Sequence, residues 1–413
     1  MREMKNSGIE WIGEYPSNWK LERLQWHLSE IVEKNSPIVT TQVLSLTNTR
    51  GVIPYEEKGA QGNVAKENYE GYKIAYPHTI VANSMNILIG SVGYSKFYGC
   101  VSPVYYVYKE KLGNDLRFIN YIMQTTQFQK ELRRYANGIL EIRLRISSAN
   151  ILKRLCAFPE LEEQIKIADY LDSKCKRIEN VIAKQEEIIK KLSQYKYSCF
   201  SEILDHTCTS CVSVGKIIDK IEQGWSPSPA ERKDENGWKV LTLAAVKYGK
   251  FNCCENKPFD GSQDKCERLL LSKGDFLLTR SNTRELVGQV CIVGEVEANT
   301  IFSDLIYRIT FNTSYILPEY ALYAFQSPRM RQQISRDAHG SSSTMVKITH
   351  KDIANWEIGI PSIEEQYSII DKLRKIEAMV DKDTKKREVL INKLQEYRKS
   401  LVYEVVTGKK EVR

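Results

Sequence analysis

The sequence lacks long apolar runs, which excludes one large class of proteins. In 413 residues, no stretch approaches the roughly 20 apolar residues that a membrane-spanning helix needs. The first residues also lack the apolar core of a secretory signal peptide. We therefore expect a cytoplasmic protein that makes no contact with a membrane.

Cysteine and histidine are present, but they do not form a metal-ligand pattern. The ten cysteines include one isolated Cys208-x-x-Cys211 and the adjacent pair Cys253-Cys254, and none of the five histidines pairs at metal spacing. A structural zinc site would want a second cysteine pair or two suitably spaced histidines. Without a secretion signal, ordinary reduced thiols are the better interpretation. We predict no bound metal.

Motifs that carry catalysis are also missing. The chain has no P-loop, no Asn/Asp-Pro-Pro-aromatic motif and no Gly-x-Ser-x-Gly elbow. Glu56-Glu57-Lys58 contains the Glu-x-Lys fragment of many nucleases, but three residues match often by chance, and a charged loop explains them better. The sequence therefore favours a non-catalytic protein that binds no cofactor of its own.

What the sequence does contain is a second copy of part of itself. Residues 158–204 align without a gap with 360–406 at a constant offset of 202, with 15 identities in 47 positions. Upstream, Ile146 and Ile348 keep the same offset. A period of this length is too long for a solenoid unit and indicates a duplicated domain. The identities include Pro159/Pro361, Glu163/Glu365, Gln164/Gln366 and Leu171/Leu373.

Each repeat ends in a segment that predicts a long helix. Residues 158–204 and 360–406 carry apolar side chains at heptad positions, with Glu and Lys between them. Each proline that opens the segment is followed by two glutamates in the first turn, where the helix dipole favours carboxylates. Each helix would run about 40 residues, or roughly 60 Å. Because a single apolar stripe needs a partner, we expect the two helices to pack together, antiparallel.

The segments before these helices predict two globular domains, at 1–157 and 212–359. Both alternate short apolar runs with Gly, Pro, Asn and Ser, and helical patterns follow near 116–135 and 317–336. We predict an α+β fold with mainly antiparallel sheets, a hinge at 205–211 and a tail at 407–413. The expected strands include Val43–Leu46, Ile87–Ile89, Val104–Tyr108, Val240–Leu243, Phe276–Leu278 and Val290–Val293.

Polar loops in both globular domains are candidates for contacts to DNA. In the second domain, Arg280, Asn282 and Arg284 follow an expected strand. Arginine can bind guanine edges in a bidentate manner and asparagine can do so for adenine, although a solvated turn is the simpler alternative. In the first domain, the flexible, basic and aromatic stretch 90–99 is the nearest match. Its candidate residues are Ser91, Tyr94 and Lys96.

A further basic segment precedes each long helix. Arg143 and Arg145 lie in the first repeat, and Lys347 lies at the same offset as Arg145 in the second. Such positions suit phosphate contacts, which set register without reading sequence. The net charge of +8 permits binding to nucleic acid but does not require it.

Along nearly its full length, the chain resembles the specificity subunit of type I restriction–modification systems. The opening Ser7-Gly-Ile-Glu-Trp-Ile-Gly-Glu-Tyr-Pro-Ser-Asn-Trp19 is similar to the start of that family. The repeated Pro-x-x-Glu-Glu-Gln at 159–164 and 361–366, and the ending Val405-Val-Thr-Gly-Lys409, resemble its other signatures. The duplicated set at constant offset carries the resemblance.

The resemblance implies two target-recognition domains, each reading half of a split, asymmetric site in double-stranded DNA. It implies that the two helices set the spacing and dock two methylation subunits, to which restriction subunits add in the larger complex. S-adenosylmethionine, ATP and Mg²⁺ would then be bound by those partners. The repeated motifs would place partner contacts at Glu163, Gln164, Glu365 and Gln366.

Other function classes remain open from the residues alone. An enzyme with unrecognised motifs, such as a nuclease or methyltransferase, is one of them. A scaffold that uses the paired helices for assembly only is another. A specificity subunit of a related phage-defence methylation system is a variant of the main interpretation.

Overall fold

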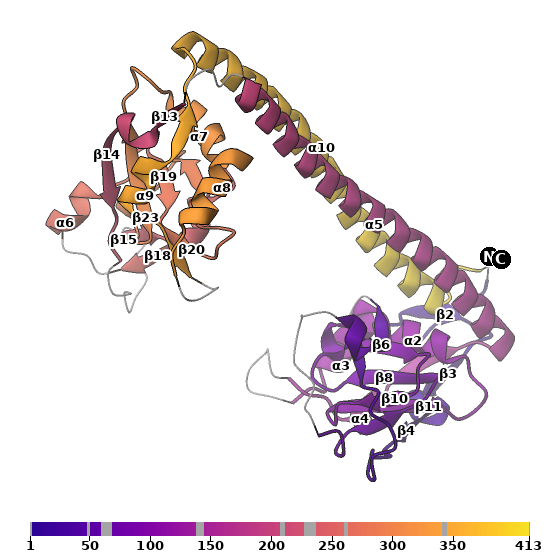
Figure 1. Cartoon of the computed structure of the whole chain (residues 1–413). Coiled ribbons are helices and arrows are strands. Elements are labelled where there is room, and N and C mark those ends of the chain that lie inside the picture. Colours follow the sequence, from indigo (N-terminus) through magenta and orange to yellow (C-terminus); the bar gives the residue numbers. More distant parts are fainter. Residues whose placement is uncertain are drawn as a thin grey trace. The chain divides into compact units, whose positions relative to one another are not determined.

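A computed structural model describes residues 2–47, 50–58, 68–137, 144–206, 211–226, 237–259, 263–340 and 345–412. The chain forms two compact units (Figure 1). The first unit holds Met1–Gln185 and Glu388–Arg413, and the second holds Glu186–Arg387. Each unit therefore combines one globular part with one portion of each long helix.

The globular part of the first unit is built on a four-stranded antiparallel sheet of order β4-β11-β8-β9. Its strands β8 and β11 are rich in buried β-branched and aromatic side chains, which suit a pleated, half-buried surface. The elements are β1 (Met4–Asn6), β2 (Glu14–Pro16), β3 (Lys20–Arg23), α1 (Leu24–His27), β4 (Leu28–Ile31), β5 (Leu44–Thr47), β6 (Gly51–Pro54), β7 (Lys73–Ala75), β8 (Thr79–Asn83), β9 (Val92–Ser95), β10 (Gly99–Val101), β11 (Tyr105–Glu110), α2 (Leu116–Gln124), α3 (Thr126–Arg133), α4 (Ser148–Leu152) and β12 (Leu155–Phe158).

The second unit repeats this frame with a sheet of order β14-β23-β19-β21. It adds a smaller sheet in which β15 pairs antiparallel with β18 and parallel with β22. Because the pairs of the larger sheet are antiparallel, the sheets of this unit are mainly antiparallel. Its elements are β13 (Cys211–Ser213), β14 (Ile218–Gln223), β15 (Trp238–Leu241), β16 (Val246–Lys247), β17 (Lys250–Phe251), β18 (Asn256–Phe259), α6 (Gln263–Arg268), β19 (Phe276–Thr279), β20 (Ser281–Asn282), β21 (Val290–Ile292), β22 (Thr300–Phe302), β23 (Ile306–Phe311), α7 (Pro318–Gln326), α8 (Pro328–Asp337), β24 (Val346–Lys347), α9 (His350–Asn355) and β25 (Glu357–Gly359).

The helical patterns near 116–135 and 317–336 each form two helices. Thr125 and Ser327, which differ by the same offset of 202, end α2 and α7 in extended conformation. Each hydroxyl then accepts a hydrogen bond from the backbone three residues on, which caps the N-terminus of α3 or α8. A short polar side chain therefore breaks the helix in both repeats.

The two long helices are α5 (Leu161–His206) and α10 (Ile363–Val406). In the first unit, Leu171 and Ile178 of α5 share a core with Leu401 and Val405 of α10. In the second unit, the other ends of the two helices pack with the globular part in the same way, around Phe200 and Leu373. Within each unit the two helical segments lie side by side (Figure 1).

The end of the chain packs on its beginning within the first unit (Figure 1). The Tyr403 hydroxyl donates to the carbonyl of Trp11 at 3.0 Å, and the Lys409 ammonium donates to the carbonyl of Ile12 at 2.7 Å. Gly408 has φ +72° and lies against Pro16, where a Cβ would approach the proline ring to 2.4 Å. Residues predicted as a tail, from 407 onward, are therefore part of the first unit.

Two further segments, expected as a strand and as a hinge, have the following structure. Ile87–Ile89, expected as a strand, forms a 3₁₀ turn that ends at Gly90, whose φ of +93° closes it. A run of three apolar residues does not distinguish a strand from a turn by periodicity alone. The expected hinge at 205–211 overlaps the end of α5 and the start of β13, and residues 207–210 lie outside the described residues.

Within the described ranges, no helix is long and apolar enough to cross a bilayer. No group of three or more His, Cys, Asp or Glu side chains in those ranges could hold a metal ion.

Candidate nucleic-acid interface

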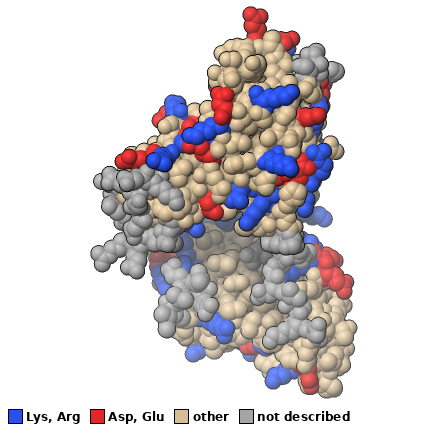
Figure 2. Space-filling model, turned by 60° about the vertical axis from the view of Figure 1, so that its left-hand side comes forward, with Lys and Arg blue, Asp and Glu red and all other residues tan. Residues whose placement is uncertain are grey.

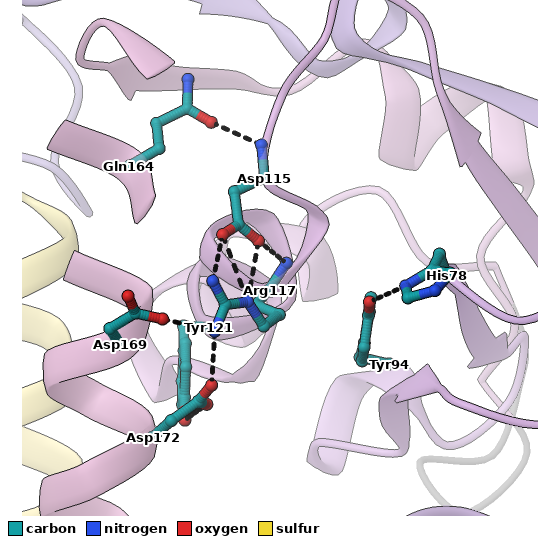
Figure 3. A network of polar contacts seen from close by, with 8 residues as sticks. All are labelled: His78, Tyr94, Asp115, Arg117, Tyr121, Gln164, Asp169 and Asp172. Atoms are coloured by element: carbon teal, nitrogen blue, oxygen red, sulfur yellow. Dashed lines mark hydrogen bonds and ion pairs between the residues drawn. The ribbon is translucent and has the colours of Figure 1, made fainter. Parts of the chain in front are cut away.

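Gln164 and Gln366, predicted to contact a partner, instead join each long helix to its own globular part. The side chains are 3% and 0% exposed. Gln164 Oε1 accepts from the backbone N–H of Asp115 at 3.1 Å (Figure 3), and Gln366 Oε1 accepts from that of Leu317 at 2.8 Å. Each Nε2 also donates to the carbonyl of the proline five residues earlier, at 3.0 Å. Burial therefore removes both amides from any partner surface, which corrects that prediction.

The neighbouring glutamates have local roles. Glu163 is half-buried, pairs with Arg2 and accepts a hydrogen bond from the Trp19 indole at 3.1 Å. Glu365 is exposed and completes a cap with Ser362, whose backbone N–H donates to it at 2.9 Å. These bonds lower the pKa of Glu365. Only Glu365, of the four predicted partner residues, lies exposed at the surface.

Next to the Gln164 contact, a cluster of charges joins α2 to α5 (Figure 3). Arg117 Nη1 lies 2.7 Å from Asp169 and 2.9 Å from Asp172, and its Nη2 lies 2.6 Å from Asp115. The Tyr121 hydroxyl donates to Asp172 at 2.6 Å, and burial together with this carboxylate raises the pKa of Tyr121. The cluster fixes the first globular part on its helix.

The same contact in the second unit has the opposite polarity. Glu319 stands at the position of Arg117, and Arg374 stands at that of Asp172, both at an offset of 202. Their side chains lie 3.8 Å apart. The two repeats therefore share a frame but differ in the charges that hold it together.

In the second unit, the structure brings the predicted DNA-contacting residues together. Ser281 and Asn282 form the short strand β20, which pairs antiparallel with β24, so that Ser281 lies opposite Lys347. Lys347 is exposed. A predicted base-contacting segment and a predicted phosphate-contacting residue thus share one edge, although Ser281 and Lys347 are 66 positions apart in the chain.

Arg280 lies at the start of this edge. Its guanidinium stands 5.8 Å from the ring centre of Tyr307, and its Nη1 donates to the Asp304 carbonyl at 3.4 Å. The Nε is buried without a hydrogen-bond partner among the described residues. His350 packs on the same tyrosine, with ring centres 4.5 Å apart, and burial together with the charge of Arg280 lowers the pKa of His350. Arg280 therefore keeps unused donor capacity beside an aromatic surface.

The rest of the loop is held from α8. Arg331 donates to the carbonyls of Val287 and Glu285, at 2.7 and 3.0 Å. Arg284 is exposed and donates to the Ser335 carbonyl at 2.8 Å. Gly288 ends the loop with φ +70°, and a Cβ there would meet Ile334 at 2.7 Å, so only glycine fits. The segment is a braced loop, whereas the simpler sequence-based alternative was a solvated turn.

The first-unit counterpart of this loop is not the stretch 90–99 that the sequence suggested. The backbone N–H of Ile348 donates to the carbonyl of Arg280 at 3.0 Å, and that of Ile146 donates to the carbonyl of Ser84 at 3.1 Å. Ser84 therefore occupies the position of Arg280. The counterpart loop runs from Ser84 to Gly90, and Gly90, like Gly288, has positive φ. The gapless offset of 202 does not extend to this loop, which is why sequence comparison missed it.

The segments that follow these loops match more simply. Asn137 and Arg145 exchange two backbone hydrogen bonds, of 2.7 and 2.9 Å, and His339 and Lys347 exchange the same pair at 2.9 and 2.8 Å. Arg145 and Lys347 are both exposed. They occupy equivalent places beside the two loops. Arg143, the third predicted phosphate contact, lies outside the described residues.

The three remaining candidates in the first unit differ in their accessibility. Ser91 is 3% exposed, and its backbone bonds to Asn83 and Asn86, so it cannot contact DNA as predicted. Tyr94 is half-buried on β9, with its hydroxyl bonded to His78 (Figure 3). Lys96 follows β9 and is exposed. Residues 92–95 of this stretch form β9, which pairs antiparallel with β8.

Tyr94 and Lys96 also line a cavity of about 640 Å³ in the first unit. Its wall is formed by β6, β9, α2, α5 and the last part of α10. The lining combines cationic, aromatic and amide side chains with the two carboxylates Asp172 and Glu179. They include Arg50, Arg117, Asn120, Tyr121, Gln124, Cys175, Lys176, Glu179 and Arg398.

The charges on the surface are mixed. Figure 2 shows Lys and Arg interspersed with Asp and Glu on the visible face. Among the described residues, the visible face therefore shows no large patch of one charge that would by itself attract phosphates strongly.

Part of the chain matches a known protein family, and several known proteins are similar to it. Residues 212–392 match the family described as Type I restriction modification DNA specificity domain. The Type I restriction enzyme EcoKI specificity subunit of Escherichia coli (strain K12) is 24% identical over 238 residues, 54% of this chain and 50% of that protein. The EcoEI specificity subunit of Escherichia coli is 25% identical over 162 residues, 39% of this chain and 27% of that protein. The chain thus matches half or less of the length of these two relatives.

The fold agrees with these matches. A chain in a solved structure concerning complex assembly and conformational transition of the type I R-M system aligns with a TM-score of 0.71 at 14% identity, covering 96% of this chain and 99% of that chain. That similarity extends over both units, beyond the segment that the family match covers. Residues 212–392 thus match the type I restriction modification DNA specificity domain, and the whole chain is similar in sequence or fold to specificity subunits of type I restriction enzymes and to a chain of a type I R-M system.

Proposed function

We propose that the chain is the DNA-reading subunit of a type I restriction–modification complex. Each globular part reads one half of a bipartite, asymmetric site in double-stranded DNA, and the two long helices set the distance between the halves. One observation carries this proposal. The two units hold equivalent loops on the same frame, but Ser84 stands in one loop where Arg280 stands in the other. A shared frame with different loop residues suits the reading of two different half-sites.

Two methylation subunits dock on the repeated helix starts in this proposal. Leu161 and Ile165 on α5 are 45% and 40% exposed, and Tyr367, at the position of Ile165 in the second repeat, is 62% exposed. Exposed apolar side chains at equivalent places favour two copies of one partner. Glu365 lies near Tyr367 and would add a polar contact.

The chemistry belongs to the partners in this proposal. The methylation subunits bind S-adenosylmethionine and transfer the methyl group, and restriction subunits use ATP and Mg²⁺. The chain itself acts by positioning DNA and its partners. Purified chain is expected to show no methyl transfer with S-adenosylmethionine and no DNA cleavage with Mg²⁺, which separates this function from that of an enzyme.

The decisive experiment is a methylome of cells that express this chain with its methylation subunit. A split motif with a fixed spacer is expected. Residues 212–340 are then exchanged for the same region of a relative. One half of the motif should change, while the other half and the level of methylation stay the same.

Two results would contradict the proposal. If the exchange changes both half-sites, the globular parts do not read DNA independently. If the reconstituted complex binds DNA without sequence preference, an assembly scaffold becomes the better interpretation. The same methylome also identifies a related phage-defence methylation system, because its modified base and motif would differ from those of a restriction-linked system.

A further inference from the structure

The cavity of the first unit contains buried polar atoms that the described protein groups leave unsatisfied. Asn120 on α2 is 8% exposed and lines the cavity, and its Oδ1 has no hydrogen-bond partner among the described residues. Arg398 also lines the cavity, and its Nε is likewise buried and unpartnered within those residues, although its Nη2 lies 3.2 Å from Glu179. An unsatisfied buried group costs roughly 1–3 kcal/mol. The Asn120 oxygen is an acceptor and the Arg398 Nε–H is a donor. A ligand that carries both a hydrogen-bond donor and an acceptor could therefore satisfy the two groups.

The rest of the lining narrows the class of ligand. Tyr94 and Tyr121 supply aromatic surface, and Gln124 adds a second amide. Lys96 and Lys176 are exposed at the cavity, whereas the two lining carboxylates, Asp172 and Glu179, pair with Arg117 and Arg398. The volume of about 640 Å³ falls in the range of small-molecule sites, roughly 300–1,000 Å³.

We propose that this cavity binds one nucleotide. Aromatic side chains stack on nucleobases, and amide side chains donate to and accept from the edges of bases. In this arrangement the base lies among the tyrosines and the amides of Asn120 and Gln124, and its phosphate lies near Lys96 and Lys176. The nucleotide comes either from bound DNA, unstacked from its strand, or from a free mononucleotide. The first source rests on the proposed function, and the second does not.

The second unit differs from the first at two positions of this lining. At the offset of 202, Leu322 replaces Asn120 and Glu377 replaces Cys175. Leu322 packs against the apolar core of the second unit, so the same place on α7 accepts an apolar side chain. Asn120→Leu is therefore the natural test substitution, because the same frame already accepts leucine there.

The first measurement is calorimetric titration of the full chain with dAMP, dCMP, dGMP, TMP and, separately, inorganic phosphate. Asn180→Leu, on the exposed face of α5, is the matched control. We expect at least one nucleotide to bind wild type and control alike, and to bind Asn120→Leu at least about 10-fold more weakly. Thermal unfolding checks that each variant is folded. If Asn120→Leu does not fold, the double variant Lys96→Ala, Lys176→Ala takes its place.

The second measurement tests DNA as the source. Duplexes carrying the bipartite site each receive one mismatched base pair in turn, because a mismatch lowers the cost of unstacking a base. We expect one mismatch position to strengthen binding by wild type and by Asn180→Leu, but not by Asn120→Leu. A gain that persists in Asn120→Leu would overturn the assignment of the DNA-borne base to this cavity.

The outcomes separate the two proposals. If wild type shows no preference among duplex sequences, the proposed function fails, and the mononucleotide titration alone decides the cavity. If inorganic phosphate binds as tightly as every nucleotide, the nucleobase assignment is wrong. If no nucleotide binds and no mismatch strengthens binding, the cavity holds only water, and the inference is overturned.

Discussion

Arg280 differs from an ordinary surface arginine in what surrounds it. Its guanidinium stands beside the Tyr307 ring, and its Nε is unpartnered among the described residues. Lys347, on the neighbouring strand, is exposed. The planar guanidinium of Arg280 suits a bidentate contact to a base edge, and the ammonium of Lys347 suits a contact to a phosphate.

We expect Arg280→Ala to weaken binding to the cognate duplex by roughly 1–3 kcal/mol and to relax one position of the second half-site. Arg284→Ala should have a smaller effect, because the Arg284 guanidinium already donates to the Ser335 carbonyl. Binding titrations against cognate and singly substituted duplexes measure both effects. A uniform loss across all sequences for Arg280→Ala would mean that Arg280 positions the protein and does not read the site.

Lys347→Ala and Arg145→Ala should behave differently. Each is expected to weaken all sequences about equally and to lower the slope of log affinity against log salt by about one unit. Titrations at two salt concentrations give this slope. A sequence-dependent loss for either variant would place a base contact at that residue.

The buried glutamines give a stability prediction at the same scale. Gln366→Ala leaves the Leu317 N–H and the Pro361 carbonyl without their partner. We expect the free energy of unfolding to fall by about 1–3 kcal/mol, because buried unpaired groups are costly. Glu364→Ala, on the exposed face two residues earlier, is the control and should change it by less than about 0.5 kcal/mol. Denaturant titration measures the free energy of unfolding of both variants. Equal losses for Gln366→Ala and Glu364→Ala would show that the Gln366 amide does not stabilise the start of the helix.

The lowered pKa of Asp337 predicts how the stability of the second unit changes at acidic pH. Its carboxylate accepts from Arg336 at 2.7 Å and from the buried Trp356 indole at 3.1 Å, and these bonds lower its pKa below the ordinary 3.8. A lowered carboxyl pKa contributes stability that is present above the unfolded value and is lost as pH falls through the folded value. Asp337→Asn should therefore flatten the acid limb of thermal stability below about pH 4. An unchanged acid limb would contradict this.

At the scale of elements, the two repeats keep the contact between a short helix and a long helix at equivalent positions, but the charges in that contact differ. Both repeats attach the first helix of the globular pair, α2 or α7, to a long helix with a buried glutamine, a tyrosine and an ion pair. The ion pair is Arg117 with Asp172 in one unit and Glu319 with Arg374 in the other. Each polarity is therefore compatible with the same backbone geometry.

This reversal can be tested directly. Arg117→Glu should destabilise the first unit by about 1–3 kcal/mol, because three carboxylates would then face a fourth. Adding Asp172→Arg should restore part of the loss, since it recreates the polarity of the second unit. A double-mutant cycle of unfolding free energies gives the coupling. Additive losses in the double variant would show that the pair does not act as a unit.

At the scale of the whole molecule, each long helix contributes to both compact units. α5 supplies residues 161–185 to the first unit and 186–206 to the second, and α10 is divided in the same manner at 387. A 46-residue helix measures roughly 70 Å at 1.5 Å per residue. Helix length is therefore the variable that the proposed spacing function depends on.

Inserting four residues after both Lys184 and Lys386 should lengthen the preferred DNA spacer by about two base pairs, or roughly 6 Å, without changing the bases read. Both helices need the insertion, because each packs against the other within a unit. Insertion after Lys184 alone should lower stability instead. A methylome of cells with each variant reports the spacer. Methylation at the original spacing in the double insertion would disprove the role of the helices in spacing.

The sequence by itself determined the duplication, the two long helices and the α+β class, because these depend on periodic patterns that repeat within the chain. A gapless offset gives equivalent positions such as Gln164 and Gln366, and a heptad stripe gives a helix. The sequence pattern did not indicate which groups Gln164 and Gln366 contact. Only tertiary structure shows that both amides are buried against their own globular parts.

The recognition loops show the same limit. Ser84 and Arg280 are equivalent only because each accepts a hydrogen bond from a matching isoleucine, and their sequence separation is 196 instead of 202. Ser281 and Lys347 lie opposite each other because two short strands pair across 66 positions of the chain. Local patterns record which element a segment forms. Which loops lie together depends on strand register and packing, and these are decided by contacts between residues far apart in the sequence.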